Sequence, residues 1–166
     1  MNANRPWGIG TRENGMGSLL FDPDGDGDLD ALLTGILGDP LVCGPNVPLC
    51  DGNRLYRNEI PGRSSRMEAD WGLADGSWGW GMALLDADND GDEEIVQTTG
   101  YSIPFPEVLT PGLRGLFVPF AHDPVRFLER DGQRFSDRAS ARGLVDTAEG
   151  RTALAVDLDN DLDLAL

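Results

Sequence analysis

The sequence predicts an all-β fold built from repeated units, each made of a strand, an acidic loop and a second strand. The first observation is the acidic stretch Asp22–Asp30, in which five carboxylates alternate along the chain and a glycine stands at the sixth place. The stretch returns with the same spacing at Asp86–Glu94, and in a damaged form at Asp157–Asp163. Short apolar runs flank these stretches, as at 18–21 and 31–33. Because the starts lie at residues 22, 86 and 157, the period is 64 and then 71 residues, which indicates a repeat architecture.

The segments that enter the acidic loops favour strands over helices. Gly15 and Gly17 precede the first loop, and a similar pair precedes the second. A glycine inside a helix costs about 1 kcal/mol relative to alanine, whereas short apolar runs bounded by glycine are typical of buried strands. The rival EF-hand loop needs a bidentate glutamate at position twelve, where this chain has Leu33 and Gln97. An intracellular calcium sensor, which would need helices around its loops, therefore ranks third among the functional hypotheses.

The alternating carboxylates predict a calcium site in each of the two full loops. Two carboxylates about 4 Å apart repel by roughly 1 kcal/mol in water and about 4 kcal/mol at an effective dielectric constant of 20. Calcium removes this repulsion, because it binds about six to eight oxygens from carboxylates, backbone carbonyls and water. The expected side-chain ligands are Asp22, Asp24, Asp26 and Asp30, then Asp86, Asp88, Asp90 and Glu94. The expected backbone carbonyl donors are Asp28 and Asp92. The alternative is a solvated acidic turn that holds no specific ion.

The third acidic stretch departs from this pattern. Its candidate ligands are Asp157, Asp159, Asp161 and Asp163. In one alignment, Leu162 replaces the glycine and Ala165 falls at the ninth place. In the other, two residues are missing after Asp161, and Asp163 is the last ligand of a shortened loop. Either alignment predicts that calcium binds weakly here.

Charge is concentrated in these loops. The chain has 166 residues and a formal net charge of −16. The three loops hold 15 acidic residues, 13 Asp with Glu93 and Glu94, so the rest of the chain is nearly neutral. This distribution argues against disorder driven by charge. All 13 basic residues are arginine, and they form no basic stripe that could meet phosphate, which argues against a nucleic-acid partner.

Cys43 and Cys50 are the two cysteines, and they lie in a segment rich in glycine and proline. A small disulfide that closes this loop is the favoured interpretation, and it would imply an oxidising compartment. Two free buried thiols are the alternative. Two cysteines and the distant His122 cannot make a closed four-ligand zinc site. His122 also has no evident nucleophile partner, so no catalytic residue is assigned.

No apolar run approaches the roughly 18 or more residues of a membrane helix, so no membrane span is predicted. Residues 1–7 lack an apolar signal segment. If the protein is extracellular, we therefore expect its signal to lie outside this chain.

The repeat divides the chain into four segments. Residues 1–14 are a polar lead-in. Residues 15–76 form unit one, with strands expected at 15–21, 30–34, 53–58 and 65–69. Residues 77–146 form unit two, with strands expected at 78–85, 94–98, 126–130 and 133–137. A long insertion at 101–124 carries Phe105, Phe117 and Phe120, which either form a contact surface or cap the core locally. Residues 147–166 begin a third unit.

Three motifs carry a resemblance to a known family. The first is Gly-x-Gly, apolar residues and then Asp-x-Asp-x-Asp-Gly-Asp, at 15–30 and 79–94. The second is Asn53–Asn58, with the sequence NRLYRN, and the third runs from Arg134–Asp137 through Ala141–Leu144 to the next loop. On these motifs, which cover roughly residues 15–166, the chain resembles FG-GAP/VCBS-type repeats, the calcium-loop β-propeller blades also seen in integrin alpha-subunit heads. It looks more closely like the cartilage-acidic-protein group of these repeats.

The resemblance implies β-propeller blades of four antiparallel strands, with calcium between the first two strands of each blade. It also implies an extracellular or cell-surface setting and an extracellular protein or glycan as partner. The chain holds about two blades and the start of a third, whereas propellers close with about 4–8 blades. We therefore expect an incomplete propeller or fragment, whose remaining blades come from further chain. The chain departs from the family in Glu94, the broken third loop, the 101–124 insertion and the lack of an appended C-terminal domain.

The leading functional hypothesis is a non-catalytic, calcium-stabilised propeller segment that serves as an extracellular scaffold for binding or adhesion. The alternative is an accessory propeller portion of a secreted enzyme, for example one that degrades polysaccharides, with its active site outside this chain. Paired carboxylates can perform acid–base chemistry on glycosides. Here, however, their alternation and repetition suit an ion cage.

Overall fold

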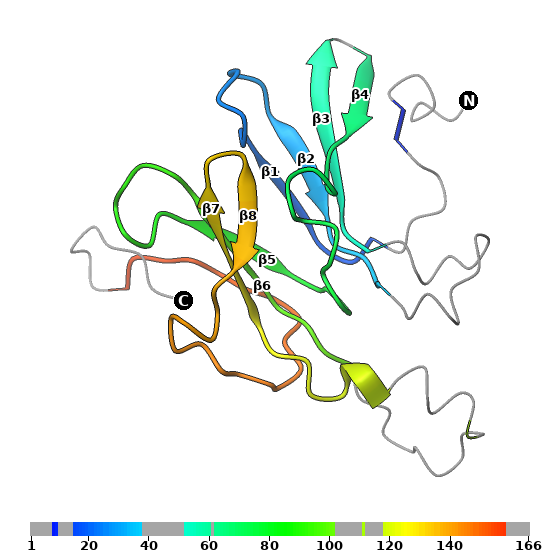
Figure 1. The fold of residues 1–166 in the computed structure, drawn as a ribbon, viewed down its shortest axis with the longest axis vertical. Helices are drawn as coiled ribbons and strands as arrows, with labels where there is room; N and C mark the ends of the chain where they lie inside the picture. The colour runs from blue at the N-terminus through cyan, green and yellow to red at the C-terminus, as the bar shows by residue number, and fades with distance from the viewer. Residues whose placement is uncertain are drawn as a thin grey trace.

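The protein forms two four-stranded antiparallel sheets, one from each unit (Figure 1). The structure is a computed structural model that describes residues 8–9, 15–37, 52–60, 62–101, 111 and 118–158. The first sheet has the order β1 (Ser18–Phe21), β2 (Asp30–Leu33), β3 (Arg54–Ile60) and β4 (Arg63–Arg66). The second has the order β5 (Met82–Leu85), β6 (Glu94–Gln97), β7 (Arg126–Asp131) and β8 (Arg134–Asp137). The prediction of an all-β fold with four-stranded antiparallel units is confirmed for the described residues.

The two sheets share one register, as expected for a structural repeat. Leu32 pairs with Leu55 across β2 and β3, and Val96 pairs with Phe127 across β6 and β7. The hairpins β1–β2 and β5–β6 also pair residue for residue at the same offsets from their acidic loops. Because a slip of one residue would turn every side chain to the opposite face, this shared register places equivalent side chains on equivalent faces.

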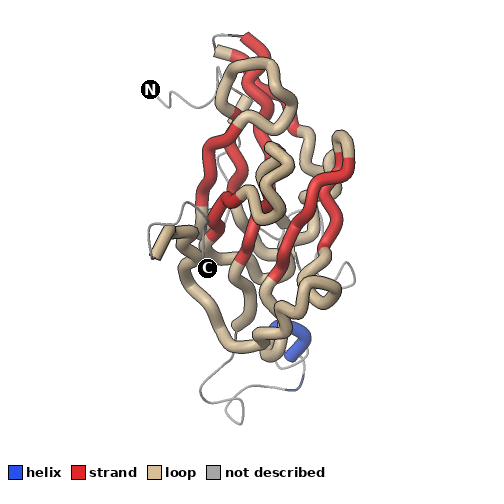
Figure 2. Tube along the Cα trace, turned by 90° about the vertical axis from the view of Figure 1, so that its left-hand side faces the viewer, coloured by secondary structure: helices blue, strands red, loops and turns tan. Residues whose placement is uncertain are grey.

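Element ends differ from the expected ones by a few residues, most visibly in the outer hairpin of unit one. The fourth strand was expected at 65–69, but β4 lies at Arg63–Arg66 and its pairing with β3 shifts between Asn58 and Ile60. A 3-10 helix, η3 (Val118–Phe120), lies near the end of the expected insertion and is the blue turn of Figure 2. Within the described ranges, no helix flanks either full acidic loop, which argues against the EF-hand alternative. None of the helices in those ranges is long and apolar enough to cross a membrane.

One hydrophobic core lies between the two sheets and joins them. Phe21, Leu32 and Leu55 supply it from the first sheet, and Ile95 and Leu128 from the second. The connector after β4 and strand β8 complete it with Trp71, Leu73 and Phe135. Burying a large apolar side chain stabilises a fold by about 1.5–3 kcal/mol relative to leaving it exposed. These residues therefore make the two units one cooperative body.

A buried polar network also links the units, on the side away from the acidic loops. The Asn53 side-chain amide donates to the Gln97 side-chain carbonyl at 2.8 Å, and the Gln97 amide donates to the Gly76 carbonyl at 2.8 Å. The Thr34 hydroxyl donates to the Trp80 carbonyl at 2.7 Å. Because Thr34, Asn53 and Gln97 are at most 1% exposed, breaking one of these hydrogen bonds would strand a buried polar group at a cost of about 1–3 kcal/mol.

The third unit begins on the far face of the second sheet. Ala153 and Ala155 pack with a second apolar cluster formed by Leu85, Val96 and Phe127. Between them, Leu154 is 69% exposed, so this segment presents alternate residues to the sheet and to solvent. That alternation is typical of a strand covered on one face. Ala153 and Ala155 therefore cover part of the face of the second sheet that points away from unit one.

Candidate metal centre

Each full acidic loop joins the first two strands of its sheet, and the two loops share one backbone conformation. Gly25 and Asn89, which occupy the same place in the two loops, have φ angles of 70° and 57°. Gly27 and Gly91, at the sixth place, have φ angles of 90° and 91°. Glycine adopts these left-handed angles without the steric cost that other residues meet. The glycine at the sixth place therefore turns the loop as the sequence predicts.

Asp22 organises the first loop by accepting hydrogen bonds from its backbone. One carboxylate oxygen, Oδ1, accepts from the Gly25 amide at 2.8 Å and from the Asp26 amide at 3.2 Å. The other, Oδ2, accepts from the Gly27 amide at 2.9 Å. Farther along, Asp26 Oδ1 accepts from the Asp28 amide at 3.0 Å. The first aspartate thus holds the loop closed around its own carboxylate.

The second loop repeats these contacts. Asp86 accepts from the amides of Asp90 and Gly91 at 3.1 and 3.0 Å, and Asp90 Oδ1 accepts from the Asp92 amide at 2.8 Å. An additional contact is made by Glu94, whose Oε2 accepts from the Ala87 amide at 2.8 Å. In both loops, therefore, the first aspartate accepts hydrogen bonds from the backbone amides at the fifth and sixth places.

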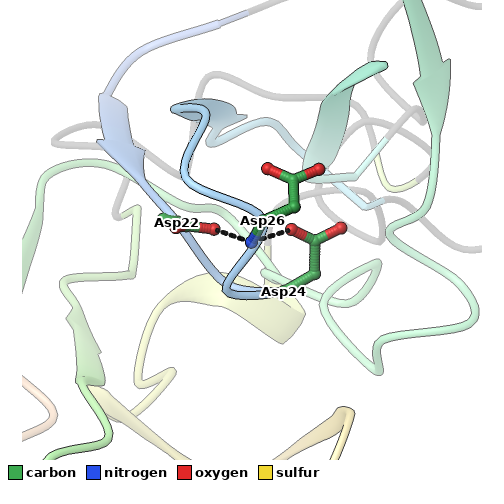
Figure 3. A group of neighbouring side chains, drawn as sticks. All are labelled: Asp22, Asp24 and Asp26. Carbon is green, nitrogen blue, oxygen red and sulfur yellow. Dashed lines mark hydrogen bonds between the residues drawn. The ribbon is translucent and has the colours of Figure 1, made fainter.

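Three carboxylates come together in each loop. Asp22, Asp24 and Asp26 each offer an oxygen within 4.8 Å of the other two. In Figure 3, the carboxylates of Asp22 and Asp24 both reach the backbone nitrogen of Asp26. In the second loop, the group is Asp86, Asp88 and Glu94, so its third member stands at the ninth place and not at the fifth. Asp30 and Asp90, which we also expected as ligands, lie outside these two groups of three.

The ninth-place carboxylates, Asp30 and Glu94, are buried, with 2% of each residue exposed. Burial is the main reason that the pKa of Asp30 is raised to about 6, and the charges of Asp24 and Asp26 raise it further. The amide of Asn58, which donates to Asp30 Oδ1 at 2.7 Å, lowers this pKa in part. Burial likewise raises the pKa of Glu94, followed by the nearby loop carboxylates. Ionising these groups is therefore unfavourable unless positive charge is close.

Arginines provide positive charge at the loops, and our sequence reasoning missed them. The Nε of Arg57, on β3, lies 2.5 Å from Asp24 Oδ2, and its Nη2 lies 3.3 Å from Asp26 Oδ2. Arg142 reaches Asp88 of the second loop at 3.4 Å, and Arg130 reaches Asp92 at 3.3 Å. The available signal was in the NRLYRN motif, because residue 57 shares the face of Leu55. It also lies nearer the loop end of the sheet, since Ala31, just after the loop, pairs with Tyr56.

The two loops lie on either side of a shared cavity of about 320 Å³. Asp22 and Asp86, the first residues of the two loops, both line it, and Arg130 contributes the positive charge. Buried Phe21 and Phe135 form part of its apolar lining. The loops of neighbouring units are therefore close enough to line one cavity.

Several predicted site residues lie outside the described ranges. These are Cys43, Cys50, Asp159, Asp161 and Asp163; of the third stretch, the structure describes Asp157 and Leu158. The pairing of the cysteines and the closure of the third loop stay predictions. Neither the protein-family models nor the curated proteins contain a match to this chain.

Proposed function

We propose that this protein is a calcium-binding repeat scaffold in which each full acidic loop binds one Ca²⁺ between the first two strands of its sheet. The observation that carries the proposal is the gathering of three carboxylates in each loop, Asp22, Asp24 and Asp26 in one and Asp86, Asp88 and Glu94 in the other. A solvated acidic turn needs no such convergence, whereas a cation site requires it. The same backbone conformation in both loops supports one role for both.

The donor set suits a hard cation. All of the converging ligands are carboxylate oxygens, which calcium, magnesium and manganese prefer, whereas zinc and copper favour nitrogen and sulfur donors. Calcium accepts irregular loops with about six to eight oxygens, while magnesium demands a nearly regular octahedron and keeps several waters. A bound cation would also stabilise the ionised forms of Asp30 and Glu94, whose pKa values burial raises.

The architecture favours a propeller segment that acts by binding rather than by catalysis. Four-stranded antiparallel sheets with the acidic loop after the first strand agree with the arrangement that FG-GAP/VCBS-type repeats imply. We propose that the two sheets are propeller blades, that the protein works at an extracellular or cell-surface site, and that its partner is a protein or glycan. The carboxylates serve as ion ligands in this proposal and perform no acid–base chemistry.

A calorimetric titration with calcium, repeated with magnesium, tests the proposal. We expect about two calcium ions per chain, with dissociation constants of roughly 10⁻⁴–10⁻³ M as in other extracellular modules, and much weaker binding of magnesium. The double variant Asp24→Asn/Asp26→Asn should lose one of the two ions. Asp28→Asn is the matched control, because residue 28 is expected to contribute only its backbone carbonyl.

Thermal unfolding of the same variants separates ion binding from other roles of the carboxylates. The double variant should lower the melting temperature in calcium and leave it nearly unchanged in chelator. Equal destabilisation in both buffers would mean that the carboxylates act through other contacts. If the wild-type chain has a β-rich circular dichroism spectrum and binds no calcium, the proposal is wrong.

A further inference from the structure

The two full acidic loops differ in the charge that the third strand of each sheet places beside them. The residue directly after the first loop pairs with Tyr56 on β3, and the residue directly after the second loop pairs with Leu128 on β7. One place farther toward the loop, the first sheet therefore carries Arg57 and the second carries Glu129. Equivalent positions thus have opposite charges, although the two loops share one backbone conformation.

In the first loop, Arg57 occupies the carboxylate oxygens that the loop does not use for its own hydrogen bonds. Asp24 Oδ1 accepts from the Asp26 amide at 3.3 Å, and Asp26 Oδ1 accepts from the Asp28 amide at 3.0 Å. The other two oxygens, Asp24 Oδ2 and Asp26 Oδ2, lie 2.5 and 3.3 Å from the Arg57 guanidinium. One planar guanidinium therefore spans two of the three carboxylates that converge in this loop.

In the second loop, the nearest arginine is shared with Glu129. Arg142 Nη2 lies 2.9 Å from Glu129 Oε2 and 3.4 Å from Asp88 Oδ2, and its Nε donates to Glu129 Oε2 at 3.0 Å. Among the described residues, no arginine forms an ion pair with Asp86 or Glu94, the other two carboxylates of the group. Only one of the three converging carboxylates therefore contacts an arginine.

The strongest electrostatic partner of each arginine differs in the same way. Asp24 is the main reason that the pKa of Arg57 is raised, whereas Glu129 is the main reason that the pKa of Arg142 is raised. Glu129 is not an expected calcium ligand, so Arg142 keeps this partner when Asp88 binds a cation. Both ion pairs of Arg57 within the described ranges are with loop carboxylates, so a cation in the first loop competes for both.

The position of Arg57 allows its guanidinium to leave the loop while the sheet stays intact. Its backbone is held inside the sheet, where Arg57 pairs with Ser65 on β4. Its side chain is 37% exposed, so water can solvate the guanidinium after it turns away. A calcium ion on Asp24 and Asp26 would lie close to this guanidinium, and like charges at such distances repel. Binding in the first loop therefore requires Arg57 to move.

We propose that Arg57 is a tethered counter-ion that calcium must displace from the first loop, so that the two loops fill in order, the second before the first. This order rests on the proposed calcium sites and adds a regulation that their shared motif does not contain. Releasing one well-aligned, partly exposed ion pair should separate the two binding midpoints by about threefold to tenfold in calcium concentration. The first loop then responds to calcium in a range in which the second loop is already filled.

A calcium titration of the full chain, followed by amide NMR, tests the order. Gly27 and Gly91 are separate reporters, because each amide donates to the first aspartate of its own loop, at 2.9 and 3.0 Å. The Gly91 signal should reach its midpoint at a calcium concentration about threefold to tenfold lower than the Gly27 signal. The Nε–H signal of the Arg57 side chain should move together with Gly27 and not with Gly91.

Three variants separate Arg57 from the rest of the loop. Arg57→Gln should lower the midpoint of Gly27 about threefold to tenfold and leave that of Gly91 unchanged. Arg63→Gln, which removes a more exposed arginine from β4, is the matched control and should move neither midpoint. Glu129→Arg places an arginine beside the second loop at the position equivalent to Arg57, so it should raise the midpoint of Gly91.

The outcomes distinguish this proposal from the calcium sites on which it rests. If Gly27 and Gly91 respond at the same calcium concentration, or Gly27 responds first, the order is wrong although both sites stand. If Arg57→Gln leaves the Gly27 midpoint unchanged, or the Arg57 side-chain signal does not follow Gly27, the proposal is overturned. If neither amide responds in a chain whose spectrum is that of a folded protein, the proposed function fails as well.

Discussion

Alanine substitutions at Gly72, in the connector after β4, and at Gly143, in the equivalent connector after β8, measure the cost of disturbing the close contact between Gly72 and β8. Gly143 has no such contact among the described residues. Both glycines have left-handed φ angles, 74° and 81°, and they occupy equivalent places in the two connectors. A residue with a side chain costs roughly 1–2 kcal/mol in this conformation. Replacing glycine also restricts the unfolded chain, which offsets about 0.4–1 kcal/mol of that cost. Gly143→Ala should therefore destabilise the fold by about 1 kcal/mol.

Gly72→Ala meets a second obstacle. The new Cβ would lie 2.4 Å from the Phe135 carbonyl oxygen, a backbone atom that cannot rotate away. The connector and β8 must then separate, and overpacking of this kind typically costs about 1–3 kcal/mol. The total for Gly72→Ala is thus about 2–4 kcal/mol. The difference between the two variants isolates the contact between the connector and the outer strand, because the backbone strain is common to both.

Urea unfolding monitored by tryptophan fluorescence gives both values, because Trp71, Trp78 and Trp80 lie at the junction between the units. The midpoint should fall more for Gly72→Ala than for Gly143→Ala, while the dependence of the unfolding free energy on urea stays near that of the wild-type chain. Equal losses, or a larger loss at Gly143, would refute this account of the contact between Gly72 and β8.

Three further predictions concern the core and the loops. Phe135→Ala should reduce the free energy of unfolding by about 3–5 kcal/mol, because it opens a cavity between the sheets; a loss below about 1 kcal/mol in urea would mean that the sheets do not share a core. Arg57→Gln should tighten calcium binding at the first loop, because the guanidinium pairs with the same carboxylate of Asp24; calorimetry checks this against Arg63→Gln, on the outer hairpin, and weaker binding would contradict it. Asp30 has a pKa raised to about 6 by burial, so in chelator its ionisation should destabilise the fold as the pH rises from about 4 through 6. In urea unfolding, Asp30→Asn should then be more stable than the wild-type chain at pH 7 and no more stable at pH 4. The reverse order would contradict the view that burial raises the pKa of Asp30.

Periodicity was enough to predict the repeat, the strand type and the loop conformation. The left-handed glycine at the sixth place, Gly27 or Gly91, follows from local backbone sterics, so the sequence predicts it directly. The strands next to the loops were also predictable, because short apolar runs between glycines leave few alternatives. The predicted boundaries of β4 were less accurate, because the irregular pairing between Asn58 and Ile60 depends on contacts across the hairpin.

The arrangement of ligands was predictable only in part. Alternation alone makes all the loop aspartates equivalent. In the structure, Asp30 is buried and accepts a hydrogen bond from the Asn58 amide, while Asp26 joins the group of three. The arginines at the loops come from strands or connectors far away in sequence. Nothing in the loop motif itself indicates that Arg57 or Arg142 would reach it.

By itself, the sequence determined the features that depend on neighbouring residues. These are the all-β repeat, the acidic loops with their left-handed turns, and the concentration of negative charge in three short stretches. Only the tertiary structure decided which faces of the sheets pack together, which arginines meet the loops, and which carboxylates converge in each loop. Those features depend on contacts between residues that are tens of positions apart, such as Phe135 with Trp71, and no local pattern encodes which pairs will meet.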